Sequence, residues 1–278
     1  MNDKIITIDQ ATVQHGPAND RVYLMKLGAG DPDGTARRIE ELAQDKGYSK
    51  IIAKVPDQAR SAFAAAAYRP EAFVPRFYRG EEGVHFMAKY LEDRRRSPED
   101  PEALAEVLAV ARGREPDSEP AALDDRYQWR ITEAGDAEAM AELYRRVFAT
   151  YPFPIHDPAY LRQTMDDNIV YFGIWDGDEL VALASAEMDE ASGNVEMTDF
   201  ATRPERRGGG FATFLLARME EEMARREVPT AYTIARAVSF GMNITFARCD
   251  YRFGGTLTNN TNISGSMESM NVWYKPLL

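Results

Sequence analysis

The first third of the chain alternates between strand-like and helix-like patterns. Short apolar runs typical of buried strands lie at 21–27, 50–56, 71–78 and 83–91. Apolar residues at helical spacing lie between them, at 33–47 and 57–68. Because strands here alternate with helices, the pattern favours an α/β unit.

From Tyr127 onward the same alternation is clearer. Strands are predicted at 128–134, 169–175, 179–188, 195–202 and 230–236. Helices are predicted at 136–149, 159–167 and 211–227. The last of these repeats apolar side chains at helical spacing, while acidic residues precede arginines by four positions on the other side. This helix should therefore have one buried face and one solvated face.

A polar segment separates the two regions. Residues 114–125 are rich in Pro, Asp and Glu, which is typical of a linker. Just before it, residues 97–113 have a helical pattern that we predict to begin with Ser97 as N-cap and Pro98 at the first helical position. The sequence therefore predicts an N-terminal α/β domain at 1–95, a connecting helix and linker at 96–126, and a second domain at 127–278.

The two regions also share a weak internal repeat. Residues 247–257 and 270–277 resemble residues 64–74 and 84–91, respectively. We interpret the N-terminal region as a reduced copy of the second domain, and a general likeness between α/β units stays open as the alternative. Since the glycine run at 208–210 has no counterpart in the N-terminal region, we assign that region no chemistry.

The net charge of the chain limits the classes of molecule that it is expected to bind. The formal net charge is −12, which opposes general binding to nucleic acid or to an anionic membrane surface, because such binding needs clustered Lys and Arg. A small cationic or zwitterionic molecule fits this balance better. No apolar run approaches the roughly 20 residues that span a bilayer, and residues 1–10 lack the apolar core of a secretion signal. We therefore expect a cytoplasmic protein.

The residues that usually bind metals are scattered along the chain. Cys249 is the single cysteine, and His15, His85 and His156 form no known zinc spacing. We therefore predict a structural thiol and no metal.

The most informative segment is the loop at 203–210 with the helix after it. A predicted strand leads into Arg207 and three consecutive glycines, and an amphipathic helix begins directly afterwards. Backbone amides at a helix start bind phosphate groups, and glycine lets the phosphate approach them closely. The segment therefore predicts a pyrophosphate site.

In this segment the chain resembles the GNAT family of N-acetyltransferases, whose coenzyme A loop reads Arg/Gln-x-x-Gly-x-Gly/Ala. Arg207, Gly210 and Ala212 fill the three defined positions, and Pro204 stands where the family often has proline. The resemblance implies a C-terminal GNAT fold with a central mixed sheet, acetyl-CoA as cosubstrate, and an asparagine, here Asn243, that contacts it. The acetyl-CoA site that it implies comprises Phe200, Ala201, Thr202, Arg207, Gly208, Gly209, Gly210, Phe211, Ala212, Thr213 and Asn243.

Within that family the chain is most similar to the β-lysine N-acetyltransferases. The shared segments are 194–202, 230–237, 241–247, 253–257, 259–263 and 268–275. Those proteins also carry an additional N-terminal domain. The resemblance implies transfer of acetyl to the terminal amine of β-lysine, which gives a compatible solute used in osmoprotection. Another small amine stays open as the substrate.

Amine acetylation needs a base, because an ammonium with a pKa of about 10.4 must lose a proton before it can attack. Glu196 lies six residues before Thr202, which is the place of the base glutamate in histone-type relatives. Strand alternation would put Glu196 on one face with Thr198, and Asp199 on the opposite face. Glu196 is the first candidate for the base and Asp199 the second.

The other roles are less well defined by the sequence. Family members often use a tyrosine as general acid where this chain has Phe246, and Tyr251 and Ser239 are the substitutes. Three further residues are candidates for binding the substrate, with Arg236 facing its carboxylate. They are Tyr232, Arg236 and Asn260.

Two features of the sequence point to other functions. Gly28 and Gly30 follow a strand as in a dinucleotide-binding turn, but the third glycine of that motif is replaced by Asp33. This argues against an NAD-dependent oxidoreductase. Phe246 leaves open a non-catalytic acyl-CoA sensor, against which the carboxylate at Glu196 argues.

Overall fold

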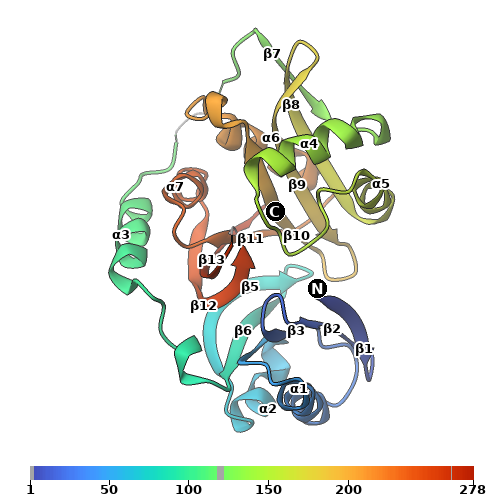
Figure 1. Ribbon diagram of the computed structural model, residues 1–278, viewed down its shortest axis with the longest axis vertical. Coiled ribbons are helices and arrows are strands. Elements are labelled where there is room, and N and C mark those ends of the chain that lie inside the picture. Colours follow the sequence, from blue (N-terminus) through green and yellow to red (C-terminus); the bar gives the residue numbers. More distant parts are fainter. Residues whose placement is uncertain (1–2, 118–121, 264) are drawn as a thin grey trace.

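The computed structural model describes residues 3–117, 122–263 and 265–278. Within them lies one 13-stranded mixed sheet that runs through both regions in the order β1-β2-β3-β4-β6-β5-β12-β13-β11-β10-β9-β8-β7. Figure 1 shows the N-terminal region at one end of the molecule and the C-terminal region at the other, with α3 alongside. Part of the predicted linker, residues 118–121, lies outside the described residues.

The N-terminal region comprises six strands and two α-helices that pack into the same hydrophobic core. Its elements are β1 (Lys4–Ile8), β2 (Ala11–Gly16), β3 (Arg21–Lys26), α1 (Pro32–Lys46), β4 (Lys50–Pro56), η1 (Asp57–Ala59), α2 (Arg60–Ala65), β5 (Arg69–Tyr78), β6 (Glu82–Tyr90) and η2 (Asp93–Arg95). The α/β prediction is confirmed, but β1 and β2 were missed. All five residues of β1 are exposed or half-buried, because it is the outermost strand of the sheet.

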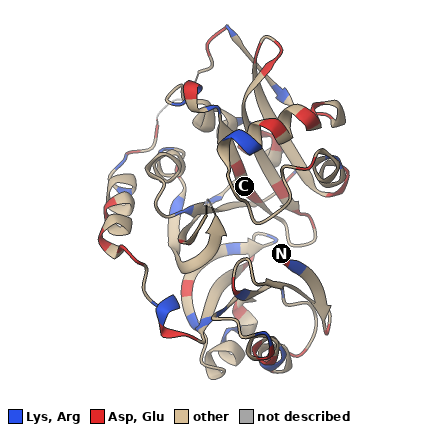
Figure 2. Ribbon diagram, in the orientation of Figure 1, with Lys and Arg blue, Asp and Glu red and all other residues tan. Residues whose placement is uncertain are grey.

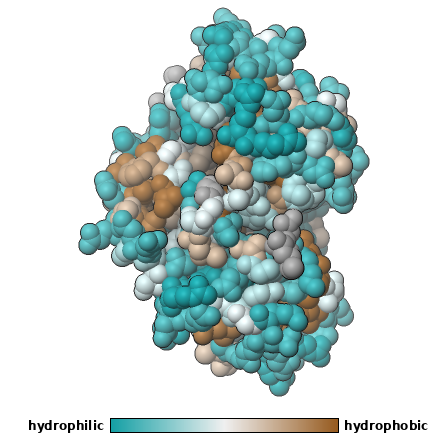
Figure 3. Space-filling view, viewed as in Figure 1, coloured by the Kyte–Doolittle hydropathy of each residue, from teal (hydrophilic) through white to brown (hydrophobic). Residues whose placement is uncertain are grey.

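The connecting helix α3 (Pro101–Arg112) begins later than predicted. Its N-cap is Asp100, whose side chain accepts a hydrogen bond from the Ala103 amide at 2.9 Å, and Pro101 opens the helix. The same cap-and-proline signal occurs at Ser97–Pro98 and again at Asp100–Pro101, and the prediction chose the first. α3 packs against α7, and Figure 3 shows apolar side chains gathered on the surface over these two helices.

The C-terminal region builds its half of the sheet from seven strands. Its elements are β7 (Tyr127–Ile131), η3 (Ala134–Asp136), α4 (Ala137–Val147), α5 (Pro158–Asp167), β8 (Ile169–Asp176), β9 (Glu179–Asp189), β10 (Asn194–Thr202), η4 (Pro204–Arg206), α6 (Phe211–Arg225), β11 (Thr230–Arg236), α7 (Phe240–Arg248), β12 (Arg252–Ile263) and β13 (Ser266–Pro276). Helices α4 and α5 cover one face of the sheet, whereas α6 and α7 cover the other. The buried face predicted for α6 is confirmed, since Phe214 and Met219 lie in the core.

The two regions repeat one topology. In both, two antiparallel steps lead to a parallel pair, β3 with β4 and β10 with β11, and a helix connects its strands. In both, the next two strands in the chain then form an antiparallel hairpin against the second strand of that pair. The regions meet where β5 pairs with β12 in antiparallel fashion, through Ala72 and Gly255. These two residues hold corresponding places in the repeat, so an approximate twofold axis passes between them.

The repeat extends to individual contacts. Lys89 forms an ion pair with Glu40 at 2.6 Å and lies over the ring of Tyr68. In the C-terminal region, Lys275 pairs with Glu220 at 2.7 Å and lies over the ring of Tyr251. The similarity seen in the sequence is therefore more than a general likeness between α/β units.

The join between the regions gives a first prediction. Gly255 has a φ of 143°, and a Cβ built there would lie 2.2 Å from the carbonyl oxygen of Glu71. Gly255→Val should therefore force β12 away from β5 and lower the free energy of unfolding by about 3 kcal/mol or more. Thermal unfolding followed by circular dichroism would measure this, with Gly135→Val as control because a Cβ there meets nothing within 4 Å. Equal melting temperatures for the two variants would contradict the prediction.

Candidate active site

A pocket of about 730 Å³ opens where β10 and β11 separate. The two strands are paired only from Asn194 to Glu196, so the backbone beyond Glu196 is open on that side. The pocket extends from the start of α6 to the N-terminal region, which contributes five of its lining residues. These are Gln14, Arg21, Tyr23, Met25 and Lys54. The N-terminal region, to which the sequence analysis assigned no chemistry, is thus part of the pocket wall.

One end of the pocket is the N-terminus of α6. Gly210 occupies the N-cap position with a φ of 74° and provides no side-chain cap, and the first turn holds no acidic residue. The first amides of the helix therefore keep their hydrogen-bonding capacity for a ligand, and the helix dipole favours an anion there. Arg207 adds an exposed guanidinium to the same loop. These residues fit the pyrophosphate of coenzyme A.

The corresponding helix of the N-terminal region, α1, offers no such site. The Asp31 carboxylate accepts hydrogen bonds from the amides of Asp33 and Gly34 at 3.2 and 3.0 Å. A carboxylate of the chain itself thus holds the place that a phosphate would take. The arrangement also removes the dinucleotide-binding interpretation of Gly28 and Gly30.

Most of the residues predicted to bind the cofactor line this end of the pocket. They are Phe200, Thr202, Arg207, Gly208, Gly209, Gly210, Phe211, Ala212 and Thr213. Ala201 is buried in the core instead. Asn243 is fully buried, donates to the carbonyls of Arg236 and Ser239, and accepts from Asn271 and Trp273. Its amide holds β11 and β13 to α7, so we do not propose a direct contact with acetyl-CoA.

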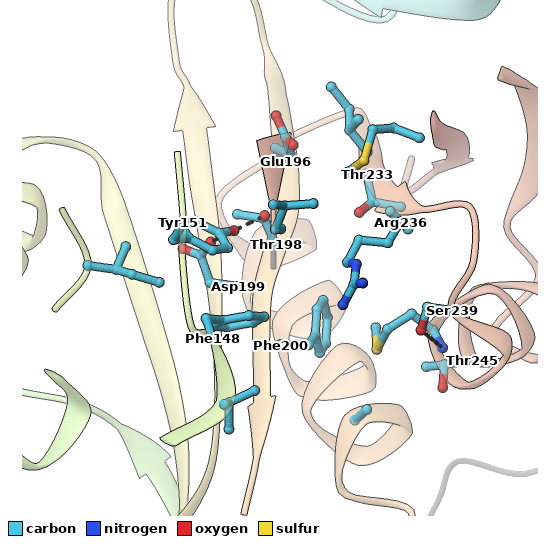
Figure 4. Close-up of a pocket in the computed structure, with 18 of the residues that line it drawn as sticks. Phe148, Tyr151, Glu196, Thr198, Asp199, Phe200, Thr233, Arg236, Ser239 and Thr245 are labelled. Carbon is cyan, nitrogen blue, oxygen red and sulfur yellow. Dashed lines mark hydrogen bonds between the residues drawn. The ribbon is translucent and has the colours of Figure 1, made fainter. Parts of the chain in front are cut away.

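The middle of the pocket contains a bulge that the sequence analysis did not foresee. The pairing of β10 with β9 shifts register between Thr198 and Ala201, and Asp199 has a φ of 54°. Strand alternation is broken there. Glu196, Thr198, Asp199 and Phe200 therefore all line the pocket, and the prediction that Asp199 faces away from Glu196 is wrong. Figure 4 shows Glu196, Thr198 and Asp199 following one another along the strand.

Two carboxylates face each other directly across the strands. Glu196 on β10 is paired in register with Glu187 on β9. Burial raises the pKa of both carboxyl groups, and the charge of Glu196 raises that of Glu187 further, whereas Lys54 acts against both shifts. Like charges opposite each other destabilise a sheet, so this pair is costly for the fold. Raised carboxyl pKa values in a pocket are typical of groups that accept protons.

Both oxygens of the Asp199 carboxylate accept hydrogen bonds from neighbouring hydroxyl groups. Tyr151 donates its hydroxyl proton to one carboxylate oxygen of Asp199, and the Ser185 hydroxyl donates to the other at 2.6 Å. These hydrogen bonds stabilise the charged form, although burial raises the pKa of Asp199 overall. A carboxylate occupied in this way suits binding an ammonium better than taking up a proton, which keeps Glu196 as our first candidate for the base.

Lys54 from β4 supplies a cation next to Glu196. Its ammonium donates to the Tyr232 hydroxyl at 2.9 Å and lies over the rings of Tyr23 and Phe77. Burial acts to lower the pKa of Lys54, but Tyr23, Tyr232 and Glu196 raise it well above its usual value, so the amine stays charged. Tyr232, a candidate substrate-binding residue, is 4% exposed and is not among the lining residues. Its hydroxyl accepts the hydrogen bond from Lys54 and so positions that ammonium group.

The other two candidate substrate-binding residues line the pocket. Arg236 forms a two-pronged ion pair with Glu268 at 2.8 and 2.6 Å, so its charge is already matched within the protein. Figure 4 shows its side chain directed towards the space between Phe200 and Ser239. Asn260 lies on β12, within the irregular stretch between Leu257 and Thr261, rather than in a loop over the pocket.

The candidate proton donors differ in whether they line the pocket. Phe246 is buried with its ring edge-on to Phe200, and Tyr251 is 4% exposed in the core and is not a lining residue. Ser239 does line the pocket, where its hydroxyl also caps α7 by accepting from the Met242 amide at 3.3 Å. Of the two substitutes, only Ser239 is placed to reach a leaving group.

Sequence reasoning missed Glu187, Tyr151 and the residues of the N-terminal region. A signal was present at Glu187, since it interrupts the apolar run of β9. Lys54 likewise interrupts an otherwise buried strand. Charged residues in buried strands are rare unless they are paired or functional.

The described residues contain no group of three His, Cys, Asp or Glu side chains arranged to hold a metal ion. None of the helices in the described ranges is both long and apolar enough to cross a membrane. Figure 2 shows acidic and basic segments interspersed over both regions.

Comparison with known proteins agrees with this geometry. Residues 137–243 match the model of the acetyltransferase (GNAT) family. A β-lysine N(6)-acetyltransferase from Methanococcus maripaludis is 38% identical over 98% of both chains, and one from Methanosarcina mazei is 32% identical over 87% of this chain and 96% of its own. The N-acetyltransferase YodP of Bacillus subtilis is 33% identical over 96% of both chains.

These relatives include the N-terminal region, so the likeness is not restricted to the coenzyme A loop. The fold, the uncapped helix α6 and the relatives agree on an enzyme that takes acetyl from acetyl-CoA. This chain therefore belongs to the GNAT family of acetyltransferases.

Proposed function

We propose that the enzyme acetylates the terminal amine of β-lysine, a small molecule with two amines and one carboxylate. The observation that carries this proposal is the group of three carboxylates beside the coenzyme A end of the pocket. Glu187, Glu196 and Asp199 all line it, and so do two cations of the N-terminal region, Lys54 and Arg21. Carboxylates attract ammonium groups and cations attract a carboxylate. Relatives that carry the name β-lysine N(6)-acetyltransferase support the same substrate.

The proposed chemistry begins with loss of a proton from the substrate's terminal ammonium to Glu196. The neutral amine attacks the thioester carbonyl and a C–N bond forms. The C–S bond then breaks, and the proton that the nitrogen gives up in becoming an amide neutralises the departing thiolate of coenzyme A. A thiol with a pKa near 8.5 is a tolerable leaving group even without a strong proton donor. Ser239 is the hydroxyl we propose to assist its departure. Asp199, fixed by Tyr151 and Ser185, adds a second negative charge that attracts the reacting ammonium towards Glu196.

Acetylation changes the charge of the product. β-Lysine has two ammonium groups and one carboxylate, so loss of one positive charge leaves a neutral zwitterion. A molecule without net charge can accumulate without a counter-ion, and we propose that the product serves as a compatible solute.

A substrate panel tests this function. Initial rates of thiol release would be measured with β-lysine, α-lysine, 1,4-diaminopentane and a lysine-containing peptide, at saturating acetyl-CoA. We expect the highest kcat/KM for β-lysine, because a site built to pair with a polar group discriminates strongly against a molecule that lacks it or carries it elsewhere. Faster turnover of the diamine or of the peptide would overturn the substrate and leave an acetyltransferase of another amine.

A further inference from the structure

The N-terminal region holds a buried cation that forms no direct ion pair with a carboxylate of the described residues. Arg21 at the start of β3 is 4% exposed and lines the pocket. Its guanidinium donates to the backbone carbonyl of Asn260 at 2.5 Å, to the Thr261 hydroxyl at 3.2 Å and to the Gln14 side-chain oxygen at 3.4 Å. All three acceptors are uncharged, and no ion pair with Arg21 occurs among residues 3–117, 122–263 and 265–278. A buried charge without a counter-ion is costly.

Two polar atoms beside this charge are left without partners. The Nε of Arg21 and the side-chain oxygen of Asn260 are both buried, and neither has a hydrogen-bond partner within the described part of the chain. Both residues line the pocket. One atom is a donor on a cation and the other is an acceptor. Together they complement a carboxylate and an ammonium that lie close to each other in one molecule, as they do in a β-amino acid.

The internal repeat shows which residue type is sufficient for a purely structural role at the position of Arg21. Its counterpart in the C-terminal region is Asn194, whose amide donates to the backbone carbonyl of Phe77 at 3.3 Å. The matching bond of Arg21 reaches Asn260, which corresponds to Phe77. An asparagine is therefore sufficient to join the two regions at this place. The larger, charged guanidinium of Arg21 is not required to join the two regions. Of the two equivalent residues, Arg21 lines the pocket and Asn194 does not.

We propose that Arg21 and Asn260 form the subsite for the amino-acid end of the substrate, with Arg21 binding its carboxylate. In the N-terminal region, the Asp31 side chain caps the start of α1, so this helix end binds no phosphate. On this proposal, the region contributes to substrate specificity instead. Arg236, which is paired with Glu268, is not needed for this role. Arg21 and Lys54 both lie over the ring of Tyr23, at 5.0 and 5.7 Å from its centre. The inference rests on the proposed function, because it assumes a substrate with a carboxylate.

The test compares the KM values of two amine substrates, β-lysine and 1,4-diaminopentane, in two variants of the enzyme. Arg21→Asn copies Asn194 and should keep the bond between the regions, while Asn194→Ala removes the corresponding bond on the side away from the pocket. We expect Arg21→Asn to raise the KM for β-lysine by roughly 10- to 100-fold, as for the loss of a hydrogen bond to a charged group. The KM values for 1,4-diaminopentane and for acetyl-CoA should change by less than about 3-fold in the same variant. Asn194→Ala should leave the ratio of the two amine KM values unchanged.

Other results of this experiment would contradict the role of Arg21, the proposed function, or both. An equal loss with both amines, or no loss with either, would overturn the role of Arg21 and leave the proposed function intact. Wild-type enzyme that does not prefer β-lysine over 1,4-diaminopentane would overturn the proposed function together with this inference. If Arg21→Asn does not fold, Arg21→Lys keeps the charge but loses the planar fork. A higher KM for β-lysine alone in that variant supports the subsite, and an unchanged ratio contradicts it.

Discussion

Glu196→Gln should lower kcat for the best amine substrate by about 10²-fold or more, because the amide keeps the shape of the side chain and cannot accept a proton. In the wild-type enzyme, burial raises the pKa of Glu196 and of its neighbour Glu187. A base works only when deprotonated, so the rate should fall as the pH decreases through these raised values. The acidic limb of the kcat/KM profile should therefore lie above the ordinary carboxylate range, and Glu196→Gln should flatten it.

Glu187→Gln is the matched control for this experiment. It removes the like charge opposite Glu196, so the pKa of Glu196 should fall and the acidic limb should move to lower pH. The two carboxylates titrate as a pair, so the shift belongs to both. If Glu187→Gln abolished the limb while Glu196→Gln only moved it, Glu187 would be the base. Asp199→Asn should affect KM for the amine more than the limb.

Gly210→Glu should lower the affinity for acetyl-CoA by about 100-fold or more. The new carboxylate would place a negative charge beside the amides at the start of α6, where the pyrophosphate of the cosubstrate is proposed to bind. A Cβ at Gly210 meets nothing within 4 Å, so the fold has room for the side chain. The left-handed backbone, with a φ of 74°, adds a cost of about 1–2 kcal/mol for a residue other than glycine. Isothermal titration with acetyl-CoA would measure the loss.

Gly47→Glu separates that backbone cost from the loss of binding. Gly47 ends α1 with a φ of 68°, has nothing within 4 Å of a Cβ, and lies outside the pocket lining. The two variants should therefore melt at similar temperatures, while only Gly210→Glu loses affinity. Unchanged acetyl-CoA binding in folded Gly210→Glu would show that the cosubstrate lies elsewhere.

The regular elements and the cofactor loop were predictable because they depend on local patterns. The α6 face follows from helical spacing, and the helix start follows from Gly210 directly before an apolar run. Most of the loop residues named from the family motif do line the pocket. Their roles in binding acetyl-CoA stay predictions.

The rest of the site depends on contacts between distant segments. The bulge at Asp199 is set by the pairing of β10 with β9, and no local pattern marks it. Arg21 reaches the pocket only because β5 and β12 join the two regions into one sheet. Asn243 shows the opposite case. The family resemblance implies that it contacts the cofactor, whereas here all its hydrogen-bonding capacity goes to the protein.

The pairing of Ala72 with Gly255 lies within a single chain. In an assembly of two identical subunits, an equivalent wall of the active site would exist only in the fraction of molecules that had found a partner, and that fraction falls on dilution. Covalent connection makes the second half permanently available at a high effective concentration. It also frees the two halves to diverge, since a substitution in one is not copied into the other. One half can keep an open anion site at Gly210 while the other closes its own with Asp31.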